Sequence, residues 1–295
     1  MNNELLVSQI EYDCQLFILE TTTSTNDELV RRACELTSLP LVPLVVISDT
    51  QTGGRGRLGR KWVSPAGGLY LSVLLDAGVA KEDSSRLASL SPLVALAARE
   101  ALQVFTGSEL LVKWPNDVLV ATGKNAGKLV GILVEVKPAS ALLKGSADNA
   151  QFVVIGIGVN VNRPSVGAHE TAAYLNDDSD QCLQLESVAS AVINELLRQI
   201  AVWQTRGCLF SSFAESYVRH MAGIGETACV RNANGDEIAQ GIVRGIDEFG
   251  SLLLQGATGE IAVTSGEVTL REPHQAKEAE RFMPNARLCQ VNCPK

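Results

Sequence analysis

The sequence of 295 residues lacks the features that mark several classes of protein. Its longest apolar stretches, such as Leu69–Leu75 and Phe152–Val159, are far shorter than the roughly 20 residues that a transmembrane helix needs. The first four residues, Met1-Asn2-Asn3-Glu4, lack the basic start and apolar segment of a secretory signal. We therefore expect a cytoplasmic protein with no membrane partner.

Metal-binding clusters and excess positive charge are also missing. The seven cysteines are odd in number and scattered, so their spacing predicts neither a disulfide framework nor a zinc site. There are 33 acidic residues against 25 basic ones, which gives a formal net charge of -8. Such a balance argues against a protein that mainly coats nucleic acid or an anionic membrane, and we expect no DNA partner.

What the chain does have is enough apolar sequence, 46%, to bury a core, and enough length for about two domains. Asn-, Gly- and Pro-rich turns between short apolar runs suit antiparallel hairpins, and longer apolar periodicities flank them. Strands are predicted at Gln15–Leu19, Leu44–Ile47, Leu69–Leu75, Leu110–Lys113, Val118–Val120, Leu129–Val136 and Phe152–Val159, and helices at Arg86–Val104, Ser187–Trp203 and Phe210–His220. The pattern predicts an α+β domain over residues 1–222.

Three further features complete the predicted organisation. A helix is expected to begin at Ser24, where Thr25 and Glu28 have the spacing of a capping box. From 223 to 271, short strands alternate with turn signals, which predicts a small β-barrel. The stretch 272–295 carries charges and prolines with little periodicity, and we expect a mobile tail.

One segment stands out for its chemistry. Between Gly53 and Trp62, four glycines and four cationic side chains occupy ten positions of an otherwise acidic protein. Glycines let backbone N–H groups approach a ligand closely, and arginines offer paired donors that fit phosphate or carboxylate oxygens. The segment therefore predicts an anion site, most simply for a phosphate.

Three other kinds of site or segment are compatible with parts of this pattern. Gly54–Gly59 satisfies G-x-G-x-x-G, with Asp76 at a plausible distance for a ribose contact, but a dinucleotide site needs a crossover helix that 60–67 cannot form. An RGG-type nucleic-acid segment is disfavoured because the cluster occurs once in an acidic chain. A solvated basic loop stays open for the segment taken alone.

Other motifs follow along the chain. They are Lys113-Trp-Pro-Asn-Asp117, Lys128-Leu-Val-Gly-Ile132 and Gly156-Ile-Gly-Val-Asn160. Each alone suits a turn, a solvated lysine or a bulge. Together with Ser24-Thr-Asn26 and the glycine-rich segment, they have the order and approximate spacing of the biotin protein ligases, which the sequence resembles over about residues 12–271.

The resemblance implies an α+β catalytic domain with a mixed sheet and flanking helices, like the class II aminoacyl-tRNA synthetases, and a C-terminal SH3-like barrel. It implies that biotin and ATP, with Mg²⁺, form biotinyl-5′-AMP, and that the biotinyl group then passes to a lysine of a biotin carboxyl carrier protein. The sequence does not give the oligomeric state, and a homodimer stays open.

The resemblance also assigns residues to roles. Arg57 and Lys128 are the expected catalytic donors. The expected contacts of biotin or biotinyl-AMP are Ser24, Thr25, Asn26, Gln51, Gly54, Arg55, Gly56, Arg57, Lys128 and Gly131, and those of the nucleotide are Trp62, Asn116 and Asn160. Metal ligands are not assigned, although Asp117 is a candidate, and Asp117 or Lys128 is a candidate to assist deprotonation of the acceptor lysine. The glycine-rich loop, Arg55–Lys61, is expected to be disordered without ligand and to order over the adenylate.

Two alternatives to a biotin ligase are kept. A lipoate–protein ligase shares the acyl-adenylate chemistry, but lipoate lacks a ureido group, so the polar set Ser24–Asn26 with Gln51 favours biotin. A non-catalytic module that senses biotin or a nucleotide is the other. Because Ser24 lies too early to leave room for a preceding DNA-binding domain of roughly 50 residues, the monofunctional type of ligase is expected.

Overall fold

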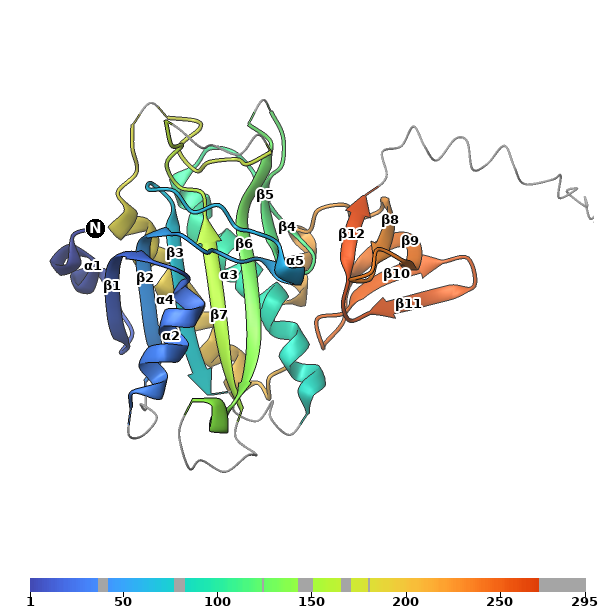
Figure 1. Ribbon diagram of the computed structural model, residues 1–295. Coiled ribbons are helices and arrows are strands. Elements are labelled where there is room, and N and C mark those ends of the chain that lie inside the picture. Colours follow the sequence, from blue (N-terminus) through green and yellow to red (C-terminus); the bar gives the residue numbers. More distant parts are fainter. Residues whose placement is uncertain are drawn as a thin grey trace, which may run out of the picture.

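The computed structural model describes residues 1–36, 42–76, 83–123, 125–142, 151–165, 171–179 and 181–270 (Figure 1). Its larger part has α1 (Asn3–Gln9), β1 (Gln15–Thr22), α2 (Thr25–Cys34), β2 (Leu44–Gln51), β3 (Leu69–Asp76), α3 (Leu90–Leu102), β4 (Leu110–Lys113), β5 (Asp117–Val120), β6 (Gly127–Pro138), β7 (Gln151–Val159), α4 (Leu185–Thr205) and α5 (Ala214–Arg219). The smaller part has β8 (Thr227–Arg231), β9 (Glu237–Ile246), β10 (Leu252–Gly256), β11 (Gly259–Val263) and β12 (Glu267–Leu270).

The larger sheet runs in the order β1-β2-β3-β7-β6-β5-β4. Only its β1–β2 pair is parallel, and the other neighbours are antiparallel. Because β2 returns to β3 as an antiparallel neighbour, the glycine-rich segment between them is no βαβ crossover, and the dinucleotide-site alternative is wrong. The α+β prediction is confirmed.

The two faces of this sheet are covered to different extents. Helices α3 and α4 pack over one face and build the main core with alternate residues of the strands. On the opposite face, α2 packs its Leu29 and Ala33 against Leu44 and Val154, and so covers only the β2–β3–β7 part (Figure 1). Residues 131, 156 and 158 share this half-covered face by strand alternation, and the candidate site lies there.

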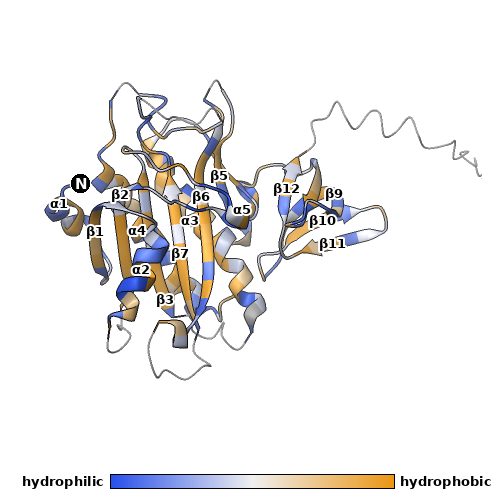
Figure 2. Ribbon diagram, viewed as in Figure 1, coloured by the Kyte–Doolittle hydropathy of each residue, from blue (hydrophilic) through white to orange (hydrophobic). Residues whose placement is uncertain are grey.

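The hydropathy of the elements follows these layers. The central strands β3, β6 and β7 are largely apolar, whereas the exposed side of α2 is hydrophilic (Figure 2). Within the described residues, the helical segment Ser85–Phe105 has the length and hydropathy of a membrane span, but 67% of its most apolar window is buried inside the protein. That segment is therefore the core helix that the sheet requires.

The smaller sheet is antiparallel throughout, in the order β11-β10-β9-β8-β12, as the predicted C-terminal β-domain requires. Its turn at Gly250 packs against the segment that follows β4 and against the start of α3. The Trp114 indole donates a hydrogen bond of 2.9 Å to the carbonyl of Gly250. A Cβ on Gly250, whose φ is +81°, would lie 2.7 Å from the Cα of Ser89, so a glycine permits this close approach.

Several local expectations need correction. Helix α1, which packs on α4, was not predicted from the sequence. The predicted helix Phe210–His220 is shorter, because only Ala214–Arg219 is α-helical. The capping box is wrong: Ser24 is the N-cap, without a side-chain cap, and Thr25 turns its hydroxyl to Gln51 and Ser72. The predicted tail, 272–295, lies outside the described residues.

Candidate active site

A cavity of about 480 Å³ opens on the half-covered face of the larger sheet. Every residue assigned from the sequence lines it except Gly54. The assigned residues that line it are Ser24, Thr25, Asn26, Gln51, Arg55, Gly56, Arg57, Trp62, Asn116, Lys128, Gly131 and Asn160. Gly54 is buried beneath the loop instead, where its carbonyl accepts the Trp62 N–H at 2.9 Å.

The floor of the cavity consists of glycines on β6 and β7. A Cβ on Gly158 would lie 2.4 Å from the Nε1 of Trp62, and a Cβ on Gly131 would lie 2.7 Å from the same indole. A Cβ on Gly156 would lie 2.4 Å from the Oδ1 of Asn26. Side chains at these positions would displace Trp62 or Asn26, so the flat floor depends on glycine.

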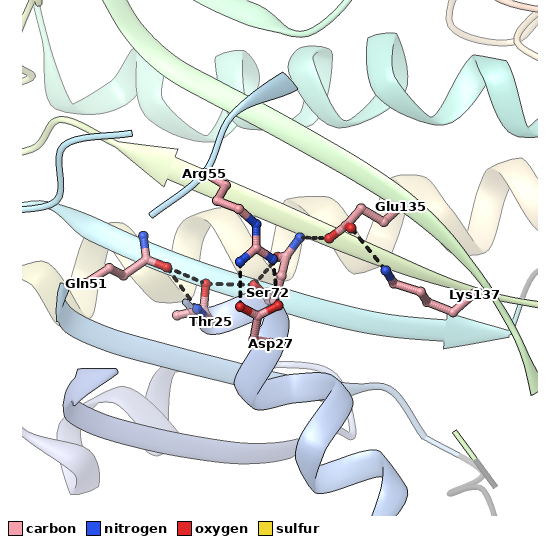
Figure 3. Close-up of polar contacts among 8 residues, drawn as sticks. Thr25, Asp27, Gln51, Arg55, Ser72, Glu135 and Lys137 are labelled. Carbon is pink, nitrogen blue, oxygen red and sulfur yellow. Dashed lines mark hydrogen bonds and ion pairs between the residues drawn. The ribbon is translucent and has the colours of Figure 1, made fainter. Parts of the chain in front are cut away.

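One end of the cavity is lined by neutral polar groups at the start of α2 and at the end of β2, with Ser72 of β3 behind them. We call Ser24, Thr25, Asn26, Gln51 and Ser72 the neutral end. The Thr25 backbone N–H donates to Gln51 Oε1 at 2.8 Å, and Gln51 Nε2 donates to Ser64 Oγ at 2.9 Å. Ser72 Oγ lies 2.8 Å from Thr25 Oγ1 and 2.6 Å from Asn26 Oδ1 (Figure 3). Its members other than Gln51 are almost fully buried.

The other end carries the charges, and we call Arg57, Lys128, Asp117 and Asn116 the charged end. Lys128 Nζ lies 2.7 Å from Asp117 Oδ1 and 5.4 Å from the centre of the Trp62 ring. Arg57 donates a hydrogen bond of 3.0 Å to Asn116 Oδ1, while Asn116 Nδ2 donates a hydrogen bond to the carbonyl of Ile132. Burial lowers the pKa of Arg57, yet a guanidinium stays charged at neutral pH.

A β-bulge brings Lys128 to this cavity. Side chains of a strand alternate between faces, so Lys128 and Gly131, three residues apart, would point to opposite sides. The pairing of β5 with β6 shifts here: Val118 pairs with Val130, but Leu119 pairs with Lys128. The extra residue places both Leu129 and Val130 in the core and restores Lys128 to the face of Gly131.

The glycine-rich loop covers the cavity through its arginines. It folds into a short hairpin, with a bridge between Arg55 and Lys61 and a 3-10 turn at Arg57–Gly59. Arg55 forms a two-bonded ion pair with Asp27 at 2.5 and 2.6 Å, and this guanidinium lowers the pKa of Asp27 (Figure 3). Arg60 lies 2.5 Å from Glu267 of β12.

Some lining residues were not assigned from the sequence. Glu267, Val268 and Thr269 come from the smaller sheet, and no local pattern shows that β12 returns to a loop some 200 residues earlier. Gly156 and Gly158 belong to the motif Gly156–Asn160, where their pattern suits a bulge equally well. Asn160 lines the cavity, but its Nδ2 donates to the carbonyl of Lys128 at 3.1 Å, so one of its roles is to hold β6 in place.

Comparisons with known proteins agree with this geometry. A model of the biotin/lipoate A/B protein ligase family matches residues 18–160, and a model of the biotin protein ligase C-terminal domain matches residues 230–271. The chain is 32% identical to the biotin–[acetyl-CoA-carboxylase] ligase of Paracoccus denitrificans, over 85% of this chain and 98% of that protein. The chain belongs to the biotin protein ligase family.

Two further relatives agree. The biotin–[acetyl-CoA-carboxylase] ligase of Mycobacterium tuberculosis is 31% identical, over 86% of this chain and 88% of that protein. The solved structure of a biotin protein ligase from Aquifex aeolicus in complex with biotin and ATP is 28% identical, with a TM-score of 0.69, and the match covers 87% of this chain and 98% of that one. The resemblance stated from the motifs is confirmed.

Acyl-adenylate ligases use a divalent cation with ATP, so the carboxylates of this cavity are relevant. In the described ranges, no three His, Cys, Asp or Glu side chains gather as a metal cluster. Mg²⁺ in such sites is commonly held by one or two carboxylates together with substrate phosphates and water. Asp117 at the charged end fits that limited role.

Proposed function

We propose that this chain is an ATP-dependent biotin protein ligase, which forms biotinyl-5′-AMP and transfers the biotinyl group to a lysine of a biotin carboxyl carrier protein. The observation that supports this best is the division of one cavity into two unlike ends. Asn26 lies over Gly156 and Trp62 over Gly158, two residues further along β7, or roughly 7 Å. A ligand with a neutral polar head and a short acidic tail suits such a cavity.

Biotin has this shape. Its ureido head would occupy the neutral end, where hydroxyls and amides offer paired hydrogen bonds within an enclosed space. Its apolar rings and tail would cross the floor of Gly131, Gly156 and Gly158 beside Trp62. Its carboxylate would then reach the charged end, which places Arg57 and Lys128 next to the reacting atoms.

The first reaction joins two anions. The biotin carboxylate attacks the α-phosphate of ATP, and pyrophosphate leaves. Negative charge builds on the phosphoryl oxygens, and donors fixed in advance at that position lower the barrier, by about 3 kcal/mol for one such donor. Lys128 and Arg57 are these donors, and Asn116 orients Arg57 by its hydrogen bond of 3.0 Å. Mg²⁺ bound with ATP would neutralise the departing pyrophosphate, with Asp117 as its candidate protein ligand.

The second reaction transfers the biotinyl group to an amine. The acceptor lysine has a solution pKa near 10.4 and must lose a proton before it attacks the acyl carbon. Asp117, beside Lys128, is the group we assign to accept that proton. AMP then leaves, and Lys128 stabilises the charge on its phosphate. The hairpin from Arg55 to Lys61 would cover the adenylate in the meantime and exclude water.

The proposal extends to the partner and the organisation of the chain. The relatives are named as ligases for acetyl-CoA carboxylase, which supports a carboxylase carrier domain as the acceptor. We propose a cytoplasmic enzyme that acts as a ligase alone, without DNA or membrane partners. We also propose a catalytic domain over 1–222 and an SH3-like domain over 223–271.

One assay separates this proposal from its alternatives. ATP–pyrophosphate exchange is measured with biotin, with lipoate and with neither acid. A biotin ligase gives exchange that depends on biotin, followed by biotinylation of an added carrier domain. Exchange with lipoate alone would identify a lipoate ligase, and biotin binding without exchange would identify a sensing module.

A further inference from the structure

The neutral end continues into a carboxylate that the reaction does not use. Asn26 Nδ2 donates to Glu135 Oε2 at 2.7 Å, and Lys137 Nζ lies 3.1 Å from the other oxygen, Oε1 (Figure 3). Glu135 stands on β6, on the cavity face of the sheet, and Asn26 is 5% exposed. A charged group thus contacts the polar cluster from behind, away from the atoms that would react.

The carboxylate fixes the orientation of Asn26. A carboxylate ion can only accept hydrogen bonds, so the side of Asn26 that faces Glu135 must be its NH₂ group. The carbonyl oxygen Oδ1 therefore faces Ser72 Oγ, 2.6 Å away. Because Oδ1 also can only accept, the single hydroxyl proton of Ser72 must lie on that contact.

The same argument carries one step further. Ser72 Oγ uses its only proton to donate a hydrogen bond to Asn26 Oδ1. In its contact of 2.8 Å with Thr25 Oγ1, the Thr25 hydroxyl must therefore be the donor. The longer contact of 3.2 Å, between Thr25 Oγ1 and Gln51 Oε1, is then left without a proton. Gln51 Oε1 is itself held as an acceptor by the backbone N–H of Thr25. Two acceptor oxygens therefore lie together in the wall of the cavity.

We propose that Glu135 is a positioning residue. It fixes the donor direction of a hydrogen-bond chain that runs from Thr25 through Ser72 and Asn26 to Glu135, and so presents Thr25 Oγ1 to the ligand as an acceptor. This rests on the proposed function, in which the ligand head carries ureido N–H groups. An N–H of biotin would supply the proton that the pair of oxygens, Thr25 Oγ1 and Gln51 Oε1, lacks. Lipoate has no N–H to offer there.

The test compares substitutions that separate charge from shape. Glu135→Gln nearly keeps the shape, but its amide can donate as well as accept, so the chain loses its fixed direction. We expect the Kd of biotin, measured by calorimetry without ATP, to rise about tenfold. Glu135→Asp keeps an acceptor-only carboxylate on a shorter stem, and we expect a rise of no more than about threefold. The matched pair Glu135→Asp and Glu135→Asn, of equal length, gives the same comparison should the Gln variant fold poorly.

Two further measurements distinguish a directional role from a general structural one. The KM of ATP in pyrophosphate exchange should stay within about twofold in the Gln variant, and so should kcat at saturating biotin, because the charged end is untouched. Ser72→Ala interrupts the same hydrogen-bond chain. The double variant should therefore raise the Kd of biotin by less than the product of the two single fold-changes. Lys137→Met, which leaves the chain intact, serves as the control and should change biotin affinity by about twofold or less.

The opposite ranking would overturn the inference. If Glu135→Gln binds biotin as the parent does, or better than Glu135→Asp, then shape rather than direction matters at this position. If the effects of Ser72→Ala and Glu135→Gln simply multiply, the two residues do not act in series. A parent protein without biotin-dependent exchange would instead contradict the proposed function, and that result is seen before any variant is made.

Discussion

The two ends of the cavity are built in opposite ways. At the neutral end, the Thr25, Asn26 and Ser72 side chains are buried and hydrogen-bonded to one another. The charged end and the loop above it carry ion pairs that remain partly exposed, such as Lys128 with Asp117 and Arg60 with Glu267, where Arg60 is 66% exposed. One end is a fixed template, and the other is a set of charges that can change partners.

This difference corresponds to the two tasks of the proposed reaction. Recognition of a neutral head benefits from acceptors whose orientation is fixed in advance, because a ligand with the wrong donors leaves buried groups unpaired. Formation and transfer of the biotinyl adenylate requires charged side chains that can leave their partners within the protein and bind the phosphate oxygens as the new bond forms. The predictions below test whether the ends differ in this way, beginning with the largest effect.

Loss of the strand-end amine should have the greatest effect. Lys128→Ala removes a charge held beside the reacting oxygens, so biotin-dependent exchange should fall by about 10²–10³-fold in kcat. The Kd of biotin without ATP should change far less, because the neutral end remains. Lys137→Met, on the same strand but outside the charged end, is the matched control. Equal losses in binding and in kcat would show that the two ends are not separate.

The loop arginine should come next. Arg57→Ala removes a donor that acts mainly on the charge that develops in the transition state. We expect the rate of adenylate formation to fall by about tenfold or more. The thermal midpoint of unfolding should stay close to that of the parent, because Arg57 is partly exposed. Unchanged exchange kinetics would remove Arg57 from the mechanism. Arg219→Ala, at an exposed position on α5, is the control.

The floor between the two ends gives a third test. In Gly158→Ala the new Cβ would lie 2.4 Å from the Trp62 indole. The rigid indole ring would have to shift as a whole, whereas the end of a flexible side chain could move aside. We expect kcat/KM for biotin to fall by about tenfold, with overpacking as the cause. Gly107→Ala, where a Cβ meets nothing within 4 Å, should leave activity unchanged. A fully active Gly158→Ala enzyme would show that activity does not depend on the position of the Trp62 indole over Gly158.

The smallest effect is expected at the contact between the loop and β12. Arg60→Glu should let bound biotinyl-AMP escape about two to three times faster, because an exposed ion pair contributes little. Glu267→Arg should do the same, and the double exchange should restore the parent rate if the pair itself holds the loop. Release is followed by filtration of the preformed adenylate. The exposed pair of Arg31 on α2 and Glu35 just after that helix provides a control exchange. No recovery in the double variant would argue against this contact.

Much of this arrangement could be predicted from local sequence, because its residues lie in contiguous motifs. The glycine-rich loop, Asn116 and Lys128 each lie within such a motif, and the structure brings them to one cavity. The face of Lys128, however, depends on a bulge that strand alternation alone does not predict. Glu267 was missed for a different reason, because its approach to Arg60 is set by how the two sheets pack.

The capping box shows where a local rule failed. Thr25 and Glu28 have the right spacing, but both side chains have stronger tertiary or helix-surface partners. The Thr25 hydroxyl contacts Ser72 and Gln51, while Glu28 pairs with Arg31 and Arg32. A helix start that departs from the usual cap in this way indicates that the side chains there serve the cavity rather than the helix.

The most direct test is a crystal structure of this chain with a non-hydrolysable analogue of biotinyl-5′-AMP. The account predicts that the ureido N–H groups contact Thr25 Oγ1 and Gln51 Oε1, and that the linker in place of the phosphate contacts Lys128 and Arg57. An analogue bound in the reverse direction, or outside the glycine floor, would contradict it.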